Sequence, residues 1–149
     1  NRLMTYESLS DGGFQTGTML GSGGFIAFDE DACIVRNTWN YARFYHHESC
    51  GQCSPCREGT GWMEKVLHRI EYGHGQMSDI DLLVDVAKKI EGNTIGPLGD
   101  GAAWPVASAI RHFRDEFEWH VKQPNEAMGR NYGLAGYAKP LPKVEQTSN

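Results

Sequence analysis

The sequence of 149 residues lacks a long hydrophobic run, an excess of positive charge and a secretory signal. No apolar segment approaches the roughly 20 residues of a membrane-spanning helix, so we expect a soluble chain with no direct membrane insertion. Lys and Arg number 14 against 19 Asp and Glu, which argues against a nucleic-acid partner because such proteins normally present a basic patch. The chain also opens without Met, and we expect it to be a piece of a longer protein.

Cysteines spread along the chain are lacking as well. Three of the four, Cys50, Cys53 and Cys56, fall within seven residues, and Cys33 stands apart. A disulfide framework spreads its cysteines so that they join distant segments. The cluster of thiols therefore predicts a reduced compartment and a bound metal.

Residues 1–30 and the rest of the chain differ in pattern. The first part is rich in glycine turns, and its apolar run 25–28 is bounded by turn signals, which predicts a buried strand in a β-containing module. From Asp31 onward the apolar residues recur at helical spacing. A change of period at this point predicts a domain boundary.

The helical part predicts four amphipathic helices joined by short loops. The first covers about 31–47, the second ends at Gly73, the third begins with Ser78 as its N-cap, and the fourth begins near Pro105 and runs to Val121. This order predicts a mainly α protein with a four-helix bundle over 31–121. The stretch 122–149 has no period and several breakers, so we expect an extended C-terminal tail.

Tryptophan lies on the apolar faces of these helices, which favours core packing over electron transfer. The residues concerned are Trp39, Trp62, Trp104 and Trp119.

Cys50, Cys53 and Cys56 form a C-x₂-C-x₂-C run, which is typical of [4Fe–4S] clusters. Three thiolates can occupy three corners of the cube, and the fourth ligand comes from a distant part of the chain. A zinc site with His46 or His47 as the fourth ligand is an alternative, and His46 and His47 also fit a solvated helix end. For Cys33 the sequence favours a small buried apolar residue.

Three segments together resemble a known family, the NADH-binding flavoprotein subunit (the F-type subunit) of respiratory complex I, NADH:quinone oxidoreductase. They are the cysteine segment 48–60, the glycine-rich segment 19–24 and the segment 98–105. The resemblance implies a helical bundle with one [4Fe–4S] cluster on Cys50, Cys53 and Cys56. It also implies that residues 1–30 are the end of a ubiquitin-like β-grasp domain, and that FMN and NAD bind to an N-terminal domain absent from this chain.

The resemblance further implies an electron-relay role without bond chemistry, and hence no catalytic residue. Electrons would leave NADH through FMN and pass singly through the cluster to a neighbouring subunit. The implied partners are a thioredoxin-like [2Fe–2S] subunit and a large iron–sulfur subunit, on the cytoplasmic side of the bacterial inner membrane or the mitochondrial matrix side. The alternatives are a flavoprotein subunit of an NAD-linked hydrogenase or formate dehydrogenase, and a structural zinc or interaction module with a decayed redox site.

One position departs from the family pattern. Gly96 stands where the resemblance places the fourth thiolate, about forty positions after Cys56. A three-thiolate cluster could take water, hydroxide or a nearby His on the fourth iron, or lose that iron to become a [3Fe–4S] species. We also expect Arg57 and Arg43 to offset the negative charge of the cluster.

Overall fold

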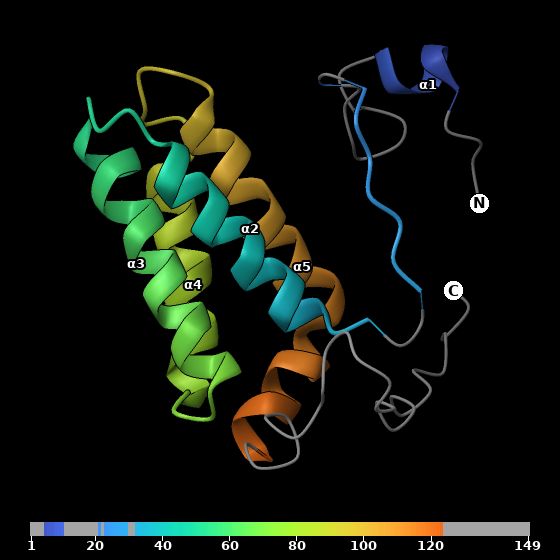
Figure 1. The fold of residues 1–149 in the computed structure, drawn as a ribbon, viewed down its shortest axis with the longest axis vertical. Coiled ribbons are helices and arrows are strands. Elements are labelled where there is room, and N and C mark those ends of the chain that lie inside the picture. Colours follow the sequence, from blue (N-terminus) through green and yellow to red (C-terminus); the bar gives the residue numbers. More distant parts are fainter. Residues whose placement is uncertain (1–4, 11–20, 22, 30–31, 124–149) are drawn as a thin grey trace.

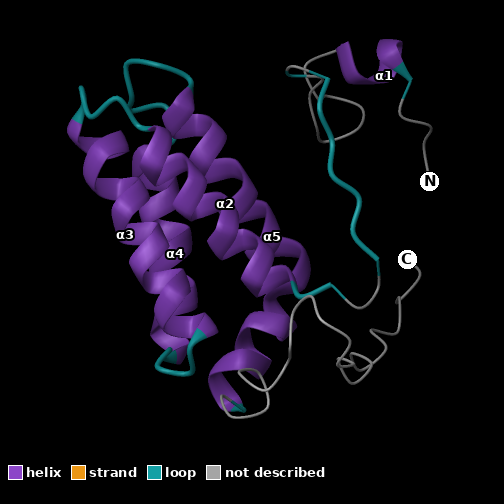
Figure 2. Ribbon diagram, in the orientation of Figure 1, coloured by secondary structure: helices purple, strands orange, loops and turns teal. Residues whose placement is uncertain are grey.

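Helices dominate the computed structural model, which describes residues 5–10, 21, 23–29 and 32–123 (Figures 1 and 2). Their bounds are α1 Tyr6–Ser10, α2 Ile34–Glu48, α3 Ser54–Glu71, α4 Met77–Ile90 and α5 Leu98–Lys122. None of these helices combines the length and the apolar stretch that a bilayer crossing needs. The predicted tail falls almost wholly outside the described residues.

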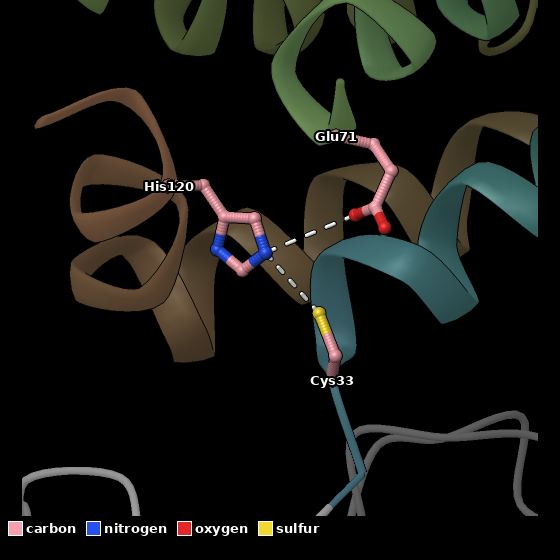
Figure 3. A group of neighbouring side chains, drawn as sticks. All are labelled: Cys33, Glu71 and His120. Atoms are coloured by element: carbon pink, nitrogen blue, oxygen red, sulfur yellow. Dashed lines mark hydrogen bonds and ion pairs between the residues drawn. The ribbon is translucent and has the colours of Figure 1, made fainter. Parts of the chain in front are cut away.

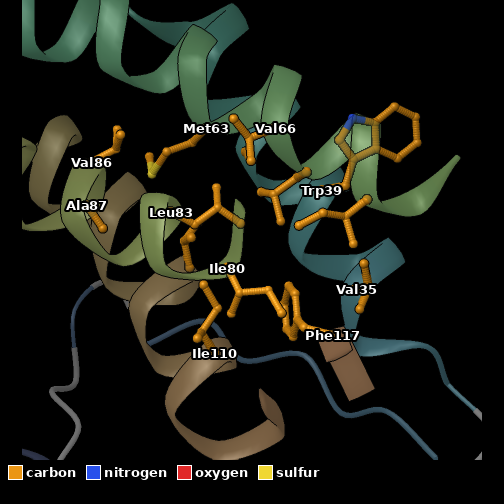
Figure 4. Packing of buried hydrophobic residues seen from close by; sticks show 14 of the residues in the cluster. Val35, Trp39, Met63, Val66, Ile80, Leu83, Val86, Ala87, Ile110 and Phe117 are labelled. Atoms are coloured by element: carbon orange, nitrogen blue, oxygen red, sulfur yellow. The ribbon is translucent and has the colours of Figure 1, made fainter. Parts of the chain in front are cut away.

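Helices α2 to α5 form the bundle that the apolar period predicts. Helices α2 and α4 each pack against both α3 and α5, and α3 also contacts α5, whereas α1 contacts none of these four. Side chains from all four helices meet in one core, where Met63, Leu83 and Phe117 are fully buried (Figure 4). The four-helix bundle is therefore confirmed.

The ends of the helices follow local capping chemistry. Asp79 accepts a hydrogen bond of 2.8 Å from the Gln76 N–H, so that Gln76 is the N-cap of α4 and the predicted Ser78 cap is wrong. Asp79 also pairs with Arg69 near the end of α3. Gly73, with φ +78°, closes α3 as predicted because a left-handed residue at this position favours glycine.

Two helices begin earlier than predicted. Helix α3 starts at Ser54 and takes in Cys56, which the sequence placed in a loop. Helix α5 starts at Leu98, so Pro105 lies inside the helix and not in its first turn. The prediction treated Gly99 as a loop residue, but this glycine packs so closely on Thr94 that a Cβ would lie 2.4 Å from the Thr94 Cγ2.

Helix α5 is kinked at Phe113, where the backbone leaves the helical region at φ −131° and ψ 29°. The Phe113 side chain is consequently 47% exposed, although its spacing predicted an apolar face. Beyond the kink, burial resumes with Glu116, Phe117 and His120.

The strand predicted at 25–28 is wrong for this structure. Those residues are loop, and Phe25 and Ile26 are 82% and 66% exposed. A strand needs a partner to satisfy its backbone groups, and no strand occurs among the described residues. The β-grasp assignment of 1–30 and the boundaries at 30 and 121 stay predictions.

Core packing is correct for one tryptophan and wrong for two. Trp39 is 6% exposed and meets the rings of His68 and Tyr72 edge-on. Trp62 and Trp104 are 51% and 42% exposed, because the faces of α3 and α5 that bear them point away from the other helices.

Candidate metal centre

The three clustered cysteines lie where α2 ends and α3 begins. Cys50 is exposed in the connecting loop, Cys53 is the half-buried N-cap of α3, and Cys56 is 6% exposed in the first turn of α3. Helix α3 is 18 residues long, and the positive end of its dipole favours negative charge nearby. The thiols thus range from open to buried around the N-terminus of one helix.

A short hydrogen-bonded chain shapes the loop. Ser49 Oγ and Cys56 Sγ share a hydrogen bond of 3.2 Å, and the Gly51 N–H donates to the same hydroxyl at 3.3 Å. Gly51 has φ +75°, a conformation that costs other residues roughly 1–2 kcal/mol. The glycine between Cys50 and Cys53 is therefore a requirement of the backbone.

Arg57 braces this loop from α3. Its Nη1 donates to the Gly51 carbonyl at 2.8 Å and its Nε to Glu58 Oε1 at 2.8 Å. The hydrogen bond from Arg57 lowers the pKa of Glu58. The guanidinium thus brings positive charge to the cysteine loop, as expected. Arg43 instead lies over the Trp39 ring, 5.5 Å from its centroid.

The two histidines before the loop point to different neighbours. His46 Nδ1 lies 2.5 Å from Glu64 Oε2, and its Nε2 would be 2.9 Å from a Cβ at Gly61. These contacts bind His46 to α3. His47 has an 86% exposed side chain and lies 3.9 Å from Glu48, which fits a solvated helix end.

Gly96 lies in the α4–α5 loop, at the same end of the bundle as the cysteine loop (Figure 1). Its backbone is outside the left-handed region, and a Cβ added there would meet nothing within 4 Å. Thr94 Oγ1 donates to its carbonyl at 2.8 Å. Neither backbone conformation nor space requires glycine at this position.

Close helix contacts hold these two loops at one end. A Cβ at Gly59 in α3 would lie 2.7 Å from the Ile90 side chain at the end of α4. A Cβ at Gly101 in α5 would lie 3.5 Å from Tyr45 in α2. Gly59 thus lets α3 approach the end of α4 beside the thiols.

A second group of metal-ligating side chains lies elsewhere in the described part of the chain. Ligand atoms of Cys33, Glu71 and His120 all fall within 4.8 Å of one another, and all three side chains are buried (Figure 3). The sequence did not reveal Glu71 and His120 because these ligands come from three separate elements and no local spacing connects them. Within the described residues, no such compact group joins the three loop thiols.

This difference bears on the zinc alternative for the loop. One zinc ion needs all its ligands around a single atom at about 2.0–2.3 Å. The thiolates of a cubane bind separate irons and lie farther apart. The spread of Cys50, Cys53 and Cys56 therefore fits a cluster better than a single ion.

Comparison with known families gives one match, over most of the bundle. Residues 36–120 match the family described as the NADH-ubiquinone oxidoreductase-F iron-sulfur binding region. The match includes the three clustered cysteines and Gly96, and excludes Cys33.

Curated relatives carry consistent names. The chain is 48% identical to an F subunit, numbered 1, of the NADH-quinone oxidoreductase of Rhizobium meliloti over 121 residues, which are 81% of this chain and 27% of the relative. It is 50% identical to the F subunit of the Rickettsia felis enzyme over 80% of this chain and 27% of that protein. With the F subunit of the Mycobacterium bovis enzyme, identity is 51% over 71% of this chain and 24% of the relative. The matched region thus spans about a quarter of the length of these relatives.

Proposed function

The chain belongs to the family of the NADH-ubiquinone oxidoreductase-F iron-sulfur binding region, and we propose that its bundle is the electron-relay part of such an oxidoreductase. One observation carries the proposal: Cys50, Cys53 and Cys56 gather around the N-terminus of α3. A C-x₂-C-x₂-C run in that setting supplies three thiolates to an iron–sulfur cluster.

Under this proposal Cys50, Cys53 and Cys56 each bind one iron of a [4Fe–4S] cluster. The cluster supplies one-electron redox chemistry when bound. The positive end of α3 and the Arg57 guanidinium favour the negative charge of the thiolates. Burial of Cys56 limits water on one side, and exposure of Cys50 leaves an edge for an electron partner.

The fourth ligand position lacks a thiolate because Gly96 has no side chain. Water, hydroxide or a histidine then completes the fourth iron, or the site holds a [3Fe–4S] species. His46 is already engaged with Glu64 at 2.5 Å, which favours a solvent ligand over this histidine.

We propose that the bundle works inside a larger assembly. The relatives are named as subunits of NADH-quinone oxidoreductases, which supports complex I over an NAD-linked hydrogenase or formate dehydrogenase. FMN and NADH then bind to a part of the protein outside this chain. Electrons pass from there to a thioredoxin-like [2Fe–2S] subunit or a large iron–sulfur subunit, on the cytoplasmic face of the bacterial membrane or the matrix face in mitochondria.

Spectroscopy of the anaerobically purified chain tests this proposal. We expect a brown protein whose visible absorbance bleaches on reduction with dithionite and returns on reoxidation. We also expect an electron paramagnetic resonance signal from a cluster in one of the two states. A colourless protein without iron, or a signal that does not change on reduction, would contradict the relay role.

A further inference from the structure

Three buried side chains meet at the end of the bundle opposite the cysteine loop. Cys33 precedes α2, Glu71 ends α3, and His120 lies in the last turn of α5 (Figure 3). His120 Nε2 lies 3.3 Å from Cys33 Sγ and 3.8 Å from Glu71 Oε2. The exposed fractions are 0% for His120, 1% for Cys33 and 4% for Glu71. Sulfur, nitrogen and oxygen thus converge away from solvent.

The ring of His120 is oriented for coordination. Its Nδ1 lies 3.0 Å from the Glu116 backbone carbonyl. A carbonyl oxygen only accepts hydrogen bonds, so Nδ1 carries the hydrogen. In the neutral ring, Nε2 then presents its lone pair toward Cys33 and Glu71. Histidines that bind metals commonly fix the other ring nitrogen on a carbonyl in this way.

The surroundings of Cys33 favour the thiolate form. Its Sγ accepts a hydrogen bond of 3.4 Å from the Arg36 N–H at the N-terminus of α2. The positive end of a helix stabilises negative charge on such a sulfur. A thiolate is the form of cysteine that binds metal ions.

Nearby charged groups are already oriented around this cluster. Glu71 Oε1 lies 3.6 Å from Arg36 Nη1, while its Oε2 faces His120. Glu116 Oε1 accepts a hydrogen bond of 2.9 Å from the Ile34 N–H. Among these groups, with Cys33 as thiolate, the two carboxylates and the sulfur carry negative charge and Arg36 carries positive charge. A divalent cation would offset the excess of negative charge.

We propose that Cys33 Sγ, Glu71 Oε2 and His120 Nε2 bind a Zn²⁺ ion. Zinc bonds of about 2.3 Å to sulfur and about 2.0 Å to nitrogen and oxygen, at a tetrahedral angle, separate sulfur from nitrogen by about 3.5 Å and nitrogen from oxygen by about 3.3 Å. The separations of 3.3 and 3.8 Å are close to these values. A thiolate with an imidazole favours zinc over Mg²⁺ or Ca²⁺, which prefer oxygen ligands.

The ion joins the start of α2 to the ends of α3 and α5. On binding, a Zn–S bond forms, the S–H bond of a protonated Cys33 breaks, and the proton goes to solvent. The site uses none of the cysteines assigned to the iron–sulfur cluster, so each proposal can fail without the other.

Zinc titration of the full chain tests the site. The background variant carries Cys50→Ser, Cys53→Ser and Cys56→Ser, which leaves Cys33 as its one thiol. We expect one equivalent of Zn²⁺ to bind with proton release, and Co²⁺ to give the intense visible bands of tetrahedral thiolate coordination. In that background Cys33→Ser and Glu71→Gln should each weaken binding about 100-fold or more, since loss of an outer-shell partner alone costs 10–100-fold.

Glu64→Gln in the same background is the matched control, because Glu64 also lies in α3 but pairs with His46. It should bind zinc like the background variant. Circular dichroism establishes that each variant is folded, and Glu71→Gln decides the question where Cys33→Ser is not. Absence of zinc binding, or equal binding in all folded variants, would overturn the proposal.

Discussion

The two ends of the bundle both carry cysteine but surround it differently. At the α2–α3 end, Cys50 and Cys53 are accessible and the loop depends on hydrogen bonds from Ser49 and Arg57. At the other end, Cys33 is buried beside charged groups drawn from three elements. Local sequence builds the first site, and tertiary packing builds the second.

This difference separates stability from cluster binding. Buried charged groups are costly to leave without partners, so we expect substitutions at the Cys33 end to change the free energy of unfolding most. The cysteine loop is more open and contributes less to the core. Substitutions there should act mainly on the metal that it holds.

The largest loss of stability is expected for His120→Ala. Removing the imidazole takes a buried partner away from Glu71, and such changes cost about 3–5 kcal/mol. Urea denaturation measures the change. His112→Ala, on the exposed face of the same helix, should change stability by no more than about 0.5 kcal/mol. Equal effects of the two substitutions would remove the contrast between the ends.

Packing beside the thiols should give an intermediate effect. Gly59→Ala forces a Cβ to within 2.7 Å of Ile90, and overpacking typically costs about 1–3 kcal/mol. Gly101→Ala places its Cβ in ordinary contact, 3.5 Å from Tyr45, and should be neutral or stabilising by up to about 1 kcal/mol. Thermal unfolding of both variants checks this order. A Gly59→Ala protein as stable as Gly101→Ala would show that the two helices can separate freely.

A smaller effect on stability is expected for Arg57→Ala. The loss of its hydrogen bond to the Gly51 carbonyl should cost about 1 kcal/mol. The loop loses its brace, however, and the cluster should decay several-fold faster in air, as followed by visible absorbance. Arg114→Ala removes an exposed arginine that pairs with Asp81 at 2.8 Å, and its decay should match the parent. Unchanged decay in Arg57→Ala would exclude a bracing role.

The smallest change in stability is expected for Gly96→Cys. A side chain meets nothing within 4 Å and no left-handed backbone opposes it, so the shift should stay within about 0.5 kcal/mol. The added thiolate should convert an incomplete or labile cluster into a stable [4Fe–4S] one, visible by electron paramagnetic resonance. Gly96→Ser is the matched control and should keep the parent spectrum. A parent that already holds a complete cubane on a protein ligand would contradict this expectation.

The sequence predicted the bundle because apolar residues such as Leu83 and Ile90 recur at helical spacing and are buried. It predicted helix ends less well. Asp79 caps α4 through Gln76, and Gly99 lies inside α5 because close packing on Thr94 overrides its low helix propensity.

The candidate cluster cysteines could be found from sequence because their spacing is local. Cys33 was placed correctly as a buried residue, but its neighbours could not be predicted. Glu71 and His120 reach it only after α3 and α5 have packed against α2. The exposure of Trp62 was missed because a helical period does not say which face another helix covers.

Iron and acid-labile sulfide content of three single-residue variants tests the central claim most directly. The variants are Cys53→Ser, Cys56→Ser and Cys33→Ser, each purified anaerobically beside the parent. We predict an iron–sulfur cluster in the parent and in Cys33→Ser, and loss of iron and sulfide together in Cys53→Ser and Cys56→Ser. An iron-free parent, or loss of the cluster in folded Cys33→Ser alone, would contradict a cluster held by the cysteine loop.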